Sequence, residues 1–144
     1  MTYTLRPIII NYRHIFREVK MNRQEFERYV LDNYDIKPDY PWAKNPDFAV
    51  FRHDGNKKWF ALIMDIPKAR LGIDEDGNTD VVNLKCDPVL IGSLKGKSGI
   101  YPAYHMNKAN WITVALDESV DDDELRMLID MSFELTAPKI HLKR

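Results

Sequence analysis

Apolar residues at helical spacing mark three helices along the chain. The first covers residues 22–34, behind a capping pair formed by Asn22 and Glu25, and the last covers 121–137. Between them, a short helix over 87–94 opens with an aspartate followed by a proline. The apolar faces of the two long helices consist of Phe26, Tyr29, Val30, Leu125, Leu128, Ile129 and Phe133.

Alternating or continuous apolar runs mark four strands, which cover residues 48–52, 58–66, 80–86 and 110–116. The second run is apolar at nearly every position, which is typical of a central strand covered on both faces. Turn signals that contain glycine separate the first three strands, so hairpins connect them. The order helix, three strands, helix, strand, helix predicts an α+β fold, in which an antiparallel β-sheet packs against helices as a two-layer sandwich.

The composition bounds the class of protein. The chain has 144 residues, of which 44% are hydrophobic and 30% charged, with a formal net charge of −1. These values fit one soluble globular domain and exclude a strongly basic nucleic-acid binder. Cys86 is the only cysteine, so a disulfide framework is excluded and a cytoplasmic location is expected. The apolar runs are too short to cross a bilayer, and the N-terminus lacks the pattern of a signal peptide.

Residues 1–20 differ from the rest of the chain, because they carry a net charge of +3 and place apolar residues at helical spacing. Met21 then begins a segment that could start a protein by itself. We therefore divide the chain into an N-terminal extension, 1–20, and an α+β domain, 21–140. The extension is an upstream addition, a misplaced start or an extra helix. A basic amphipathic helix could dock on the domain or contact a membrane surface or a partner.

A loop directly before the last strand concentrates polar side chains. His105, Asn107, Lys108 and Asn110 occur within six residues, and a rigid strand holds one end of this loop. The side chains combine hydrogen-bond donors with a fixed positive charge, which suits an anionic or polar ligand. The alternative is that His105 and Asn107 only fix an irregular loop through backbone hydrogen bonds.

Charged residues divide the domain into a basic and an acidic part. Residues 85–108 carry four lysines against one acid, with tyrosines and a histidine between them, and residues 117–134 carry eight acids against one arginine. Lysines neutralise phosphates, and exposed rings stack on bases, so the basic part could face DNA despite the net charge. The alternative is that both parts are ordinary solvated surfaces. The four lysines are Lys85, Lys95, Lys97 and Lys108.

Other chemistry finds little support in the sequence. The Lys95–Gly99 segment resembles part of a phosphate-binding loop, but it leaves a helix instead of entering one, and its glycine spacing is one residue short. The acids at 121–124 are explained by the positive end of the helix dipole. Cys86 falls on the apolar side of its strand, and the four histidines lack the spacing of metal ligands. We therefore expect no catalytic residues, no metal and no cofactor, in a protein that is not an enzyme.

Several segments together resemble the MmcQ/YjbR family. The most specific is the pattern His-x-Asn-Lys-x-x-Trp from His105 to Trp111, within the longer match Pro102–Val114. The resemblance covers about Met21 to Lys139 and leaves residues 1–20 outside. Further matching pieces are Tyr40-Pro-Trp, the Phe48–Phe51 strand, Trp59-Phe-Ala-Leu, Asn83–Pro88 and the closing helix through Pro138.

The resemblance implies a fold similar to the frataxin-like (CyaY-like) sandwich, and a DNA-binding protein with a double-wing arrangement of β-hairpins. Transferred residue by residue, it implies Lys85, His105, Asn107 and Lys108 as candidate contacts. The frataxin resemblance also implies iron binding through an acidic first helix. Here residues 22–34 hold only three acids against two basic residues, which departs from that pattern.

The function that we predict is weak, mostly non-specific DNA binding without catalysis. The four lysines would contact phosphates, and His105 and Asn107 would hold the loop or hydrogen-bond to sugars or bases. Two other functions stay open. One is a protein-interaction module, including a homodimer, and the other is a small-ligand site beside His105 and Trp42. A membrane partner of the domain is not expected.

Overall fold

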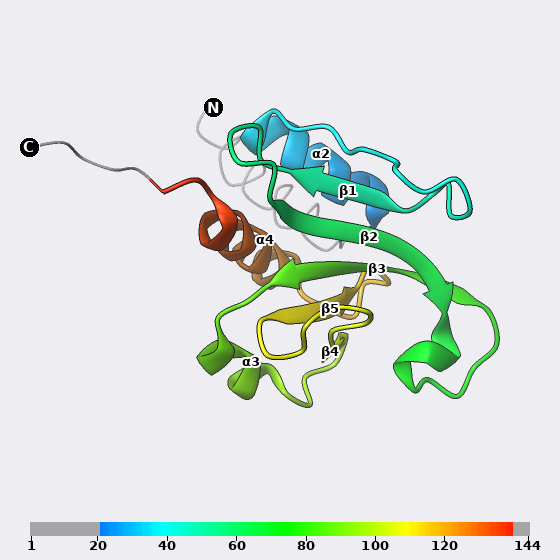
Figure 1. The fold of residues 1–144 in the computed structure, drawn as a ribbon. Coiled ribbons are helices and arrows are strands. Elements are labelled where there is room, and N and C mark those ends of the chain that lie inside the picture. Colours follow the sequence, from blue (N-terminus) through cyan, green and yellow to red (C-terminus); the bar gives the residue numbers. More distant parts are fainter. Residues whose placement is uncertain (1–20, 140–144) are drawn as a thin grey trace, which may run out of the picture.

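The fold is an antiparallel sheet with two long helices packed on one face (Figure 1). The computed structural model describes residues 21–139, so the predicted extension, 1–20, lies outside the described residues. The elements are α2 (Arg23–Tyr34), β1 (Ala49–Arg52), β2 (Trp59–Pro67), η2 (Lys68–Leu71), β3 (Asn78–Lys85), α3 (Pro88–Leu94), β4 (Ile100–Pro102), β5 (Trp111–Ala115) and α4 (Asp122–Thr136). The strands lie in the order β1-β2-β3-β5-β4, and all neighbouring pairs are antiparallel, which confirms the predicted α+β class.

Each helix begins where the sequence predicts. A side chain that stabilises a helix N-terminus lies just before the first turn or within it. Asn22 Oδ1 accepts a hydrogen bond from the backbone N–H of Glu25 at 2.9 Å, in front of α2. Asp87 Oδ1 accepts one from the N–H of Val89 at 2.8 Å, in front of α3. α4 instead places three acids in its first turn, where the positive end of the helix dipole favours them.

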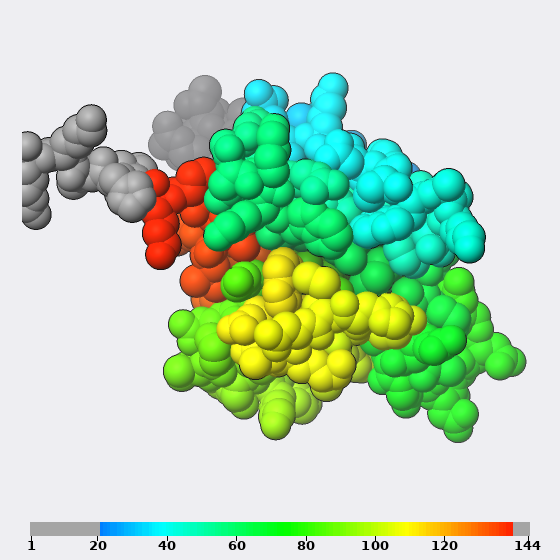
Figure 2. Space-filling model, in the orientation of Figure 1, coloured from blue at the N-terminus to red at the C-terminus, as the bar shows by residue number. Residues whose placement is uncertain are grey.

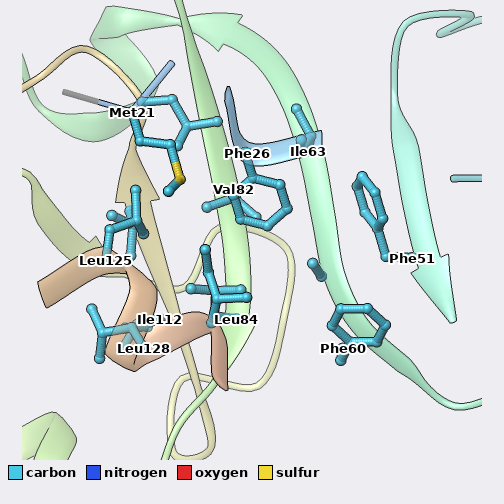
Figure 3. Packing of buried hydrophobic residues seen from close by; sticks show 14 of the residues in the cluster. Met21, Phe26, Phe51, Phe60, Ile63, Val82, Leu84, Ile112, Leu125 and Leu128 are labelled. Carbon is cyan, nitrogen blue, oxygen red and sulfur yellow. The ribbon is translucent and has the colours of Figure 1, made fainter. Parts of the chain in front are cut away.

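The main core lies between the sheet and helices α2 and α4 (Figure 3). Phe26 of α2 packs edge-on against Phe51 of β1, with ring centroids 5.5 Å apart. Leu125 and Leu128 of α4 belong to the same cluster, together with Leu84 of β3. The buried side of each long helix is the apolar face that the helical period predicts.

The opposite face of the sheet carries a second, smaller cluster. Loops cover it, because Trp42 and Tyr104 pack against it from two different connecting segments. The segment that contains Tyr104, residues 103–110, is drawn in yellow in Figure 2. β2 is therefore covered on both faces, as its continuous apolar sequence predicts. The strand residues of this cluster are Val50, Leu62, Met64, Ile66 and Val81.

The sheet contains one strand more than the sequence predicts. β4 has only three residues, and it pairs with β5 so that Ile100 faces Val114. A period of two cannot be recognised over three residues, which is why the sequence indicates only a loop here. Gly99 precedes β4 with a φ of 81°, and its carbonyl accepts the N–H of Ala115 at 2.8 Å.

Ser132 of α4 joins two strands at the point where their ladder ends. β2 and β3 pair from Ala61 and Leu84 onward, and one residue further the Ser132 hydroxyl lies between them. Ser132 Oγ donates to the Phe60 carbonyl at 2.5 Å and accepts from the Lys85 N–H at 2.8 Å. The helix therefore satisfies two backbone groups that the strands leave to it.

His53 is buried against the end of α4. Its Nε2 lies 2.8 Å from Thr136 Oγ1, and its ring packs against those of Phe60 and Phe133. Burial holds the pKa of His53 below its usual value, although a hydrogen bond with the Phe133 backbone and the charge of Asp54 act in the opposite direction. The folded protein therefore favours the neutral imidazole.

This buried imidazole predicts a loss of stability in mild acid. Below a pH of about 6.5, the usual histidine pKa, the unfolded chain binds a proton that folded His53 resists. The free energy of unfolding therefore falls as the pH drops from there toward the lowered folded pKa. Urea unfolding of the parent and of His53→Gln at about pH 7.5 and about pH 5.5 measures this effect. An equal loss in the variant, which cannot titrate at this position, would contradict it.

Candidate functional site

The polar loop before β5 is held to the sheet by two buried polar residues. Asn83 of β3 and Thr113 of β5 face each other, and both are fully buried. Thr113 Oγ1 donates to Asn83 Oδ1 at 2.5 Å, and Asn83 Nδ2 donates to the Tyr104 carbonyl at 2.8 Å. The Tyr104 N–H in turn donates to Thr113 Oγ1 at 2.8 Å, so the network fixes the loop on the sheet. Its signal in the sequence is a polar residue between two apolar ones in each strand, Asn83 between Val82 and Leu84 and Thr113 between Ile112 and Val114.

Asn107 shapes the loop from within. Its Oδ1 accepts the N–H of Ala109 at 2.8 Å, and its carbonyl accepts the N–H groups of Asn110 at 3.2 Å and Trp111 at 3.0 Å. These hydrogen bonds give Asn107 the role of fixing an irregular loop. His105 has a φ of 60°, and its exposed ring lies 3.9 Å from that of Tyr104, measured between centroids.

Two of the four candidate lysines line one apolar cleft, and a third lies against a residue of its wall. Lys95, just after α3, and Lys108, in the loop, both line this cleft of about 420 Å³. Lys85 of β3 lies half-buried beside it, with its Nζ 6.0 Å from the centroid of the Trp111 ring. We call this the Trp111 cleft; it lies where α3 approaches β4 and β5 (Figure 1). Its apolar walls are formed mainly by Ile91, Leu94, Ile100, Pro102, Trp111 and Ile112.

Lys97, the fourth candidate lysine, is engaged elsewhere. Its Nζ lies 2.6 Å from Glu124 Oε2 in the first turn of α4. The lysine side chain is 51% exposed and the glutamate 22%, so water partly screens this ion pair. The pair nevertheless neutralises the lysine locally, and it connects the basic part of the domain to the acidic helix.

Residues 31–135 match the family model named YjbR. The chain belongs to the YjbR family. It is 40% identical over 116 residues to the uncharacterized protein YyaQ of Bacillus subtilis (strain 168), an alignment that covers 81% of this chain and 98% of YyaQ. All four candidate lysines lie inside the segment that matches the YjbR model.

Solved structures of similar proteins share this fold. A crystal structure of a Pseudomonas syringae protein is 56% identical, with a TM-score of 0.79, and the match covers 81% of this YjbR-family chain and all of the other. A Deinococcus radiodurans protein is 26% identical, with a TM-score of 0.60, over 80% of this chain and 78% of its own. The family resemblance predicted from the sequence is therefore confirmed.

Trp42, named with His105 in the small-ligand alternative, packs on the second cluster of this YjbR-family protein, and so does Tyr104, the neighbour of His105. Trp42 packs edge-on against Phe48 and Trp59, with centroids 6.3 Å and 5.8 Å away. These rings form part of the second cluster, whereas the walls of the Trp111 cleft come from other residues. A small-ligand site beside His105 and Trp42 stays a prediction, and the Trp111 cleft is a separate hollow with neither residue in its lining.

The part of the chain that the structure describes offers no arrangement for binding a metal ion and no reactive thiol. Within residues 21–139, no group of three or more histidine, cysteine or acidic side chains is arranged to hold a metal ion. Cys86 is 1% exposed, and burial raises the pKa of its thiol, so the reactive thiolate is disfavoured. Every helix in the same part of the chain is too short or too polar to span a membrane.

Proposed function

We propose that this YjbR-family protein binds DNA weakly and without sequence preference, through Lys85, Lys95 and Lys108. The observation that carries the proposal is that Lys95 and Lys108, which come from different segments, line one cleft, while Lys85 of β3 lies against the ring of Trp111 in its wall. Lysine ammonium groups release counterions from DNA when they contact phosphates, and such contacts supply most non-specific affinity. The role is one of binding, with no reaction assigned to the site.

Asn107, His105 and Lys97 have different roles in the proposed binding surface. Asn107 holds the loop in shape, and the exposed His105, three residues before Lys108, would hydrogen-bond to a sugar or a base. The proposed DNA surface lies on the side of α3, β4 and β5 and does not include the β1–β2 hairpin. Because Lys97 already pairs with Glu124, it contributes less than the other lysines.

Removing two of the three lysines should weaken DNA binding about tenfold at low salt. In Lys85→Ala/Lys108→Ala, the slope of the logarithm of affinity against the logarithm of salt should become shallower by about 2, since about one phosphate contact is lost per lysine. Fluorescence anisotropy with a labelled oligonucleotide, at low and then moderate salt, measures both quantities.

The matched control is Lys37→Ala/Lys57→Ala. Both residues are exposed, and both line a hollow beside Arg52 of β1, at the other edge of the sheet. This variant loses the same charge, so it separates a local contact from the effect of net charge. An equal loss of affinity in the two double variants would contradict the assigned surface, and no binding by the parent protein at low salt would contradict DNA binding altogether.

A further inference from the structure

We infer that the Trp111 cleft receives an unstacked nucleobase, so that single-stranded DNA binds more tightly than duplex DNA; this rests on the DNA binding proposed above. Two of the lysines assigned to the phosphates line this cleft, and the third lies over the ring of Trp111. Those lysines alone would account for attraction to any nucleic acid, whereas an apolar cleft beside them calls for a ligand with a second, apolar part.

The volume and walls of the cleft fit such a group. Its volume of about 420 Å³ lies within the range of roughly 300–1,000 Å³ that is usual for small-molecule sites. Two aromatic side chains, Tyr101 and Trp111, line it together with aliphatic residues. A nucleobase is flat, with apolar faces that stack on such rings.

The lysines around the cleft favour a negatively charged ligand. Lys95 and Lys108 both line it, and Lys85 lies over the ring of Trp111. An apolar group that enters this cleft is favoured when it carries negative charge close by, and every base in a DNA strand is attached to a phosphodiester. Charge complementarity therefore points to a nucleotide of a strand, with its base in the cleft and its neighbouring phosphates at the lysines.

The shape of the cleft exists before any ligand binds. The turn between α3 and β4 is closed by two backbone hydrogen bonds, from the Lys97 N–H to the Leu94 carbonyl at 3.1 Å and from the Ile100 N–H to the Lys97 carbonyl at 3.2 Å. Leu94 and Ile100 are both buried and anchor the two ends of this turn in the core. The ion pair of Lys97 with Glu124 adds a third attachment, so little ordering is needed on binding.

Duplex DNA cannot use this site in the same way. Its bases are paired and stacked, so a base reaches the cleft only if it is first unstacked, which costs free energy. A single strand presents its bases with a much smaller penalty. Both forms still offer phosphates to the three lysines, so the cleft accounts for a difference between them rather than for binding as such.

The deciding experiment compares three probes on the unmodified protein. They are an oligothymidylate of about twelve nucleotides, a strand of the same length and charge with abasic residues, and a duplex of that length. We expect the oligothymidylate to bind about tenfold more tightly than the abasic strand. The duplex should bind with an affinity close to that of the abasic strand. The abasic strand retains every phosphate, so only the contribution of the bases differs.

Two ring variants locate the effect. Trp111→Leu and Tyr101→Leu should reduce the affinity for oligothymidylate to that for the abasic strand and leave the abasic affinity unchanged. Tyr40→Leu is the control, because Tyr40 is 53% exposed and lies outside the cleft. Thermal unfolding shows whether each variant is folded, and the three-probe comparison on the parent stands without them.

The outcomes separate the two proposals. Equal binding of the three probes, weakened in Lys85→Ala/Lys108→Ala, overturns base insertion and leaves phosphate binding in place. Tighter binding of the duplex than of the single strand also overturns base insertion. If no probe binds at low salt, the proposed function fails, and the base site fails with it.

Discussion

Replacement of Gly99 by alanine should lower the free energy of unfolding by about 3 kcal/mol, combining left-handed backbone strain with steric overpacking. The φ of 81° at this position lies where side chains are strained. An added Cβ would lie 2.6 Å from Val120 Cγ2 and would also clash with the Ser119 side chain. Because Gly99 leads directly into β4, the same substitution should disturb the Trp111 cleft. Urea unfolding measures the change in stability.

Gly96→Ala is the matched control for this prediction. Gly96 has nearly the same backbone conformation, with a φ of 82°, but an added Cβ would meet open space. Its substitution should therefore cost only the backbone part, about 1 kcal/mol. Equal losses of stability in the two variants would show that the close approach of Gly99 to Ser119 and Val120 contributes nothing.

Ser132→Ala should also cost about 3 kcal/mol, because it leaves two buried backbone groups without a partner. The Phe60 carbonyl and the Lys85 N–H both depend on this hydroxyl, at 2.5 Å and 2.8 Å. The serine is fully buried, so water cannot replace it without rearrangement. Urea unfolding gives the total loss, and hydrogen exchange at the Lys85 amide reports the local effect.

Ser93→Ala provides the comparison for the loss of a serine hydroxyl as such. Ser93 is exposed on α3, and its Oγ donates only to the Val89 carbonyl at 3.3 Å. This substitution should change stability by less than about 0.5 kcal/mol. Unaltered exchange of the Lys85 amide in Ser132→Ala would contradict the bridging role of that hydroxyl.

Local burial patterns made most of the architecture predictable. The alternation from Trp111 onward places Ile112 and Val114 in the main core, and the same reasoning places Cys86 on the buried side after β3. Such patterns arise because each residue of a strand faces either the core or the other side of the sheet. β4 was not predicted, because its three residues form a strand only by pairing with β5. The local sequence carries no sign of that contact.

The candidate site was predictable in its residue types but not in its arrangement. The sequence marks a lysine-rich stretch, yet the separation of Lys97 from the other lysines depends on Glu124, 27 residues away. Asn83 and Thr113, which fix the loop, lie 30 residues apart and meet only through strand pairing. The cleft itself needs three elements at once, so no single segment indicates it.

The two edge strands of the sheet, β1 and β4, affect whether copies of this protein can associate by strand pairing. Sheets polymerise when an outer strand offers a row of backbone groups to a neighbour. At the β1 edge, the backbone of Val50 is already paired with that of Asp39. The Asp39 N–H donates to the Val50 carbonyl at 2.8 Å, and the Val50 N–H donates to the Asp39 carbonyl at 2.9 Å. At the other, β4 is three residues long and ends in Pro102, which has no N–H to offer. Continuation of the sheet from one molecule into the next is therefore disfavoured, and concentrated protein should resist fibrous aggregation by this route.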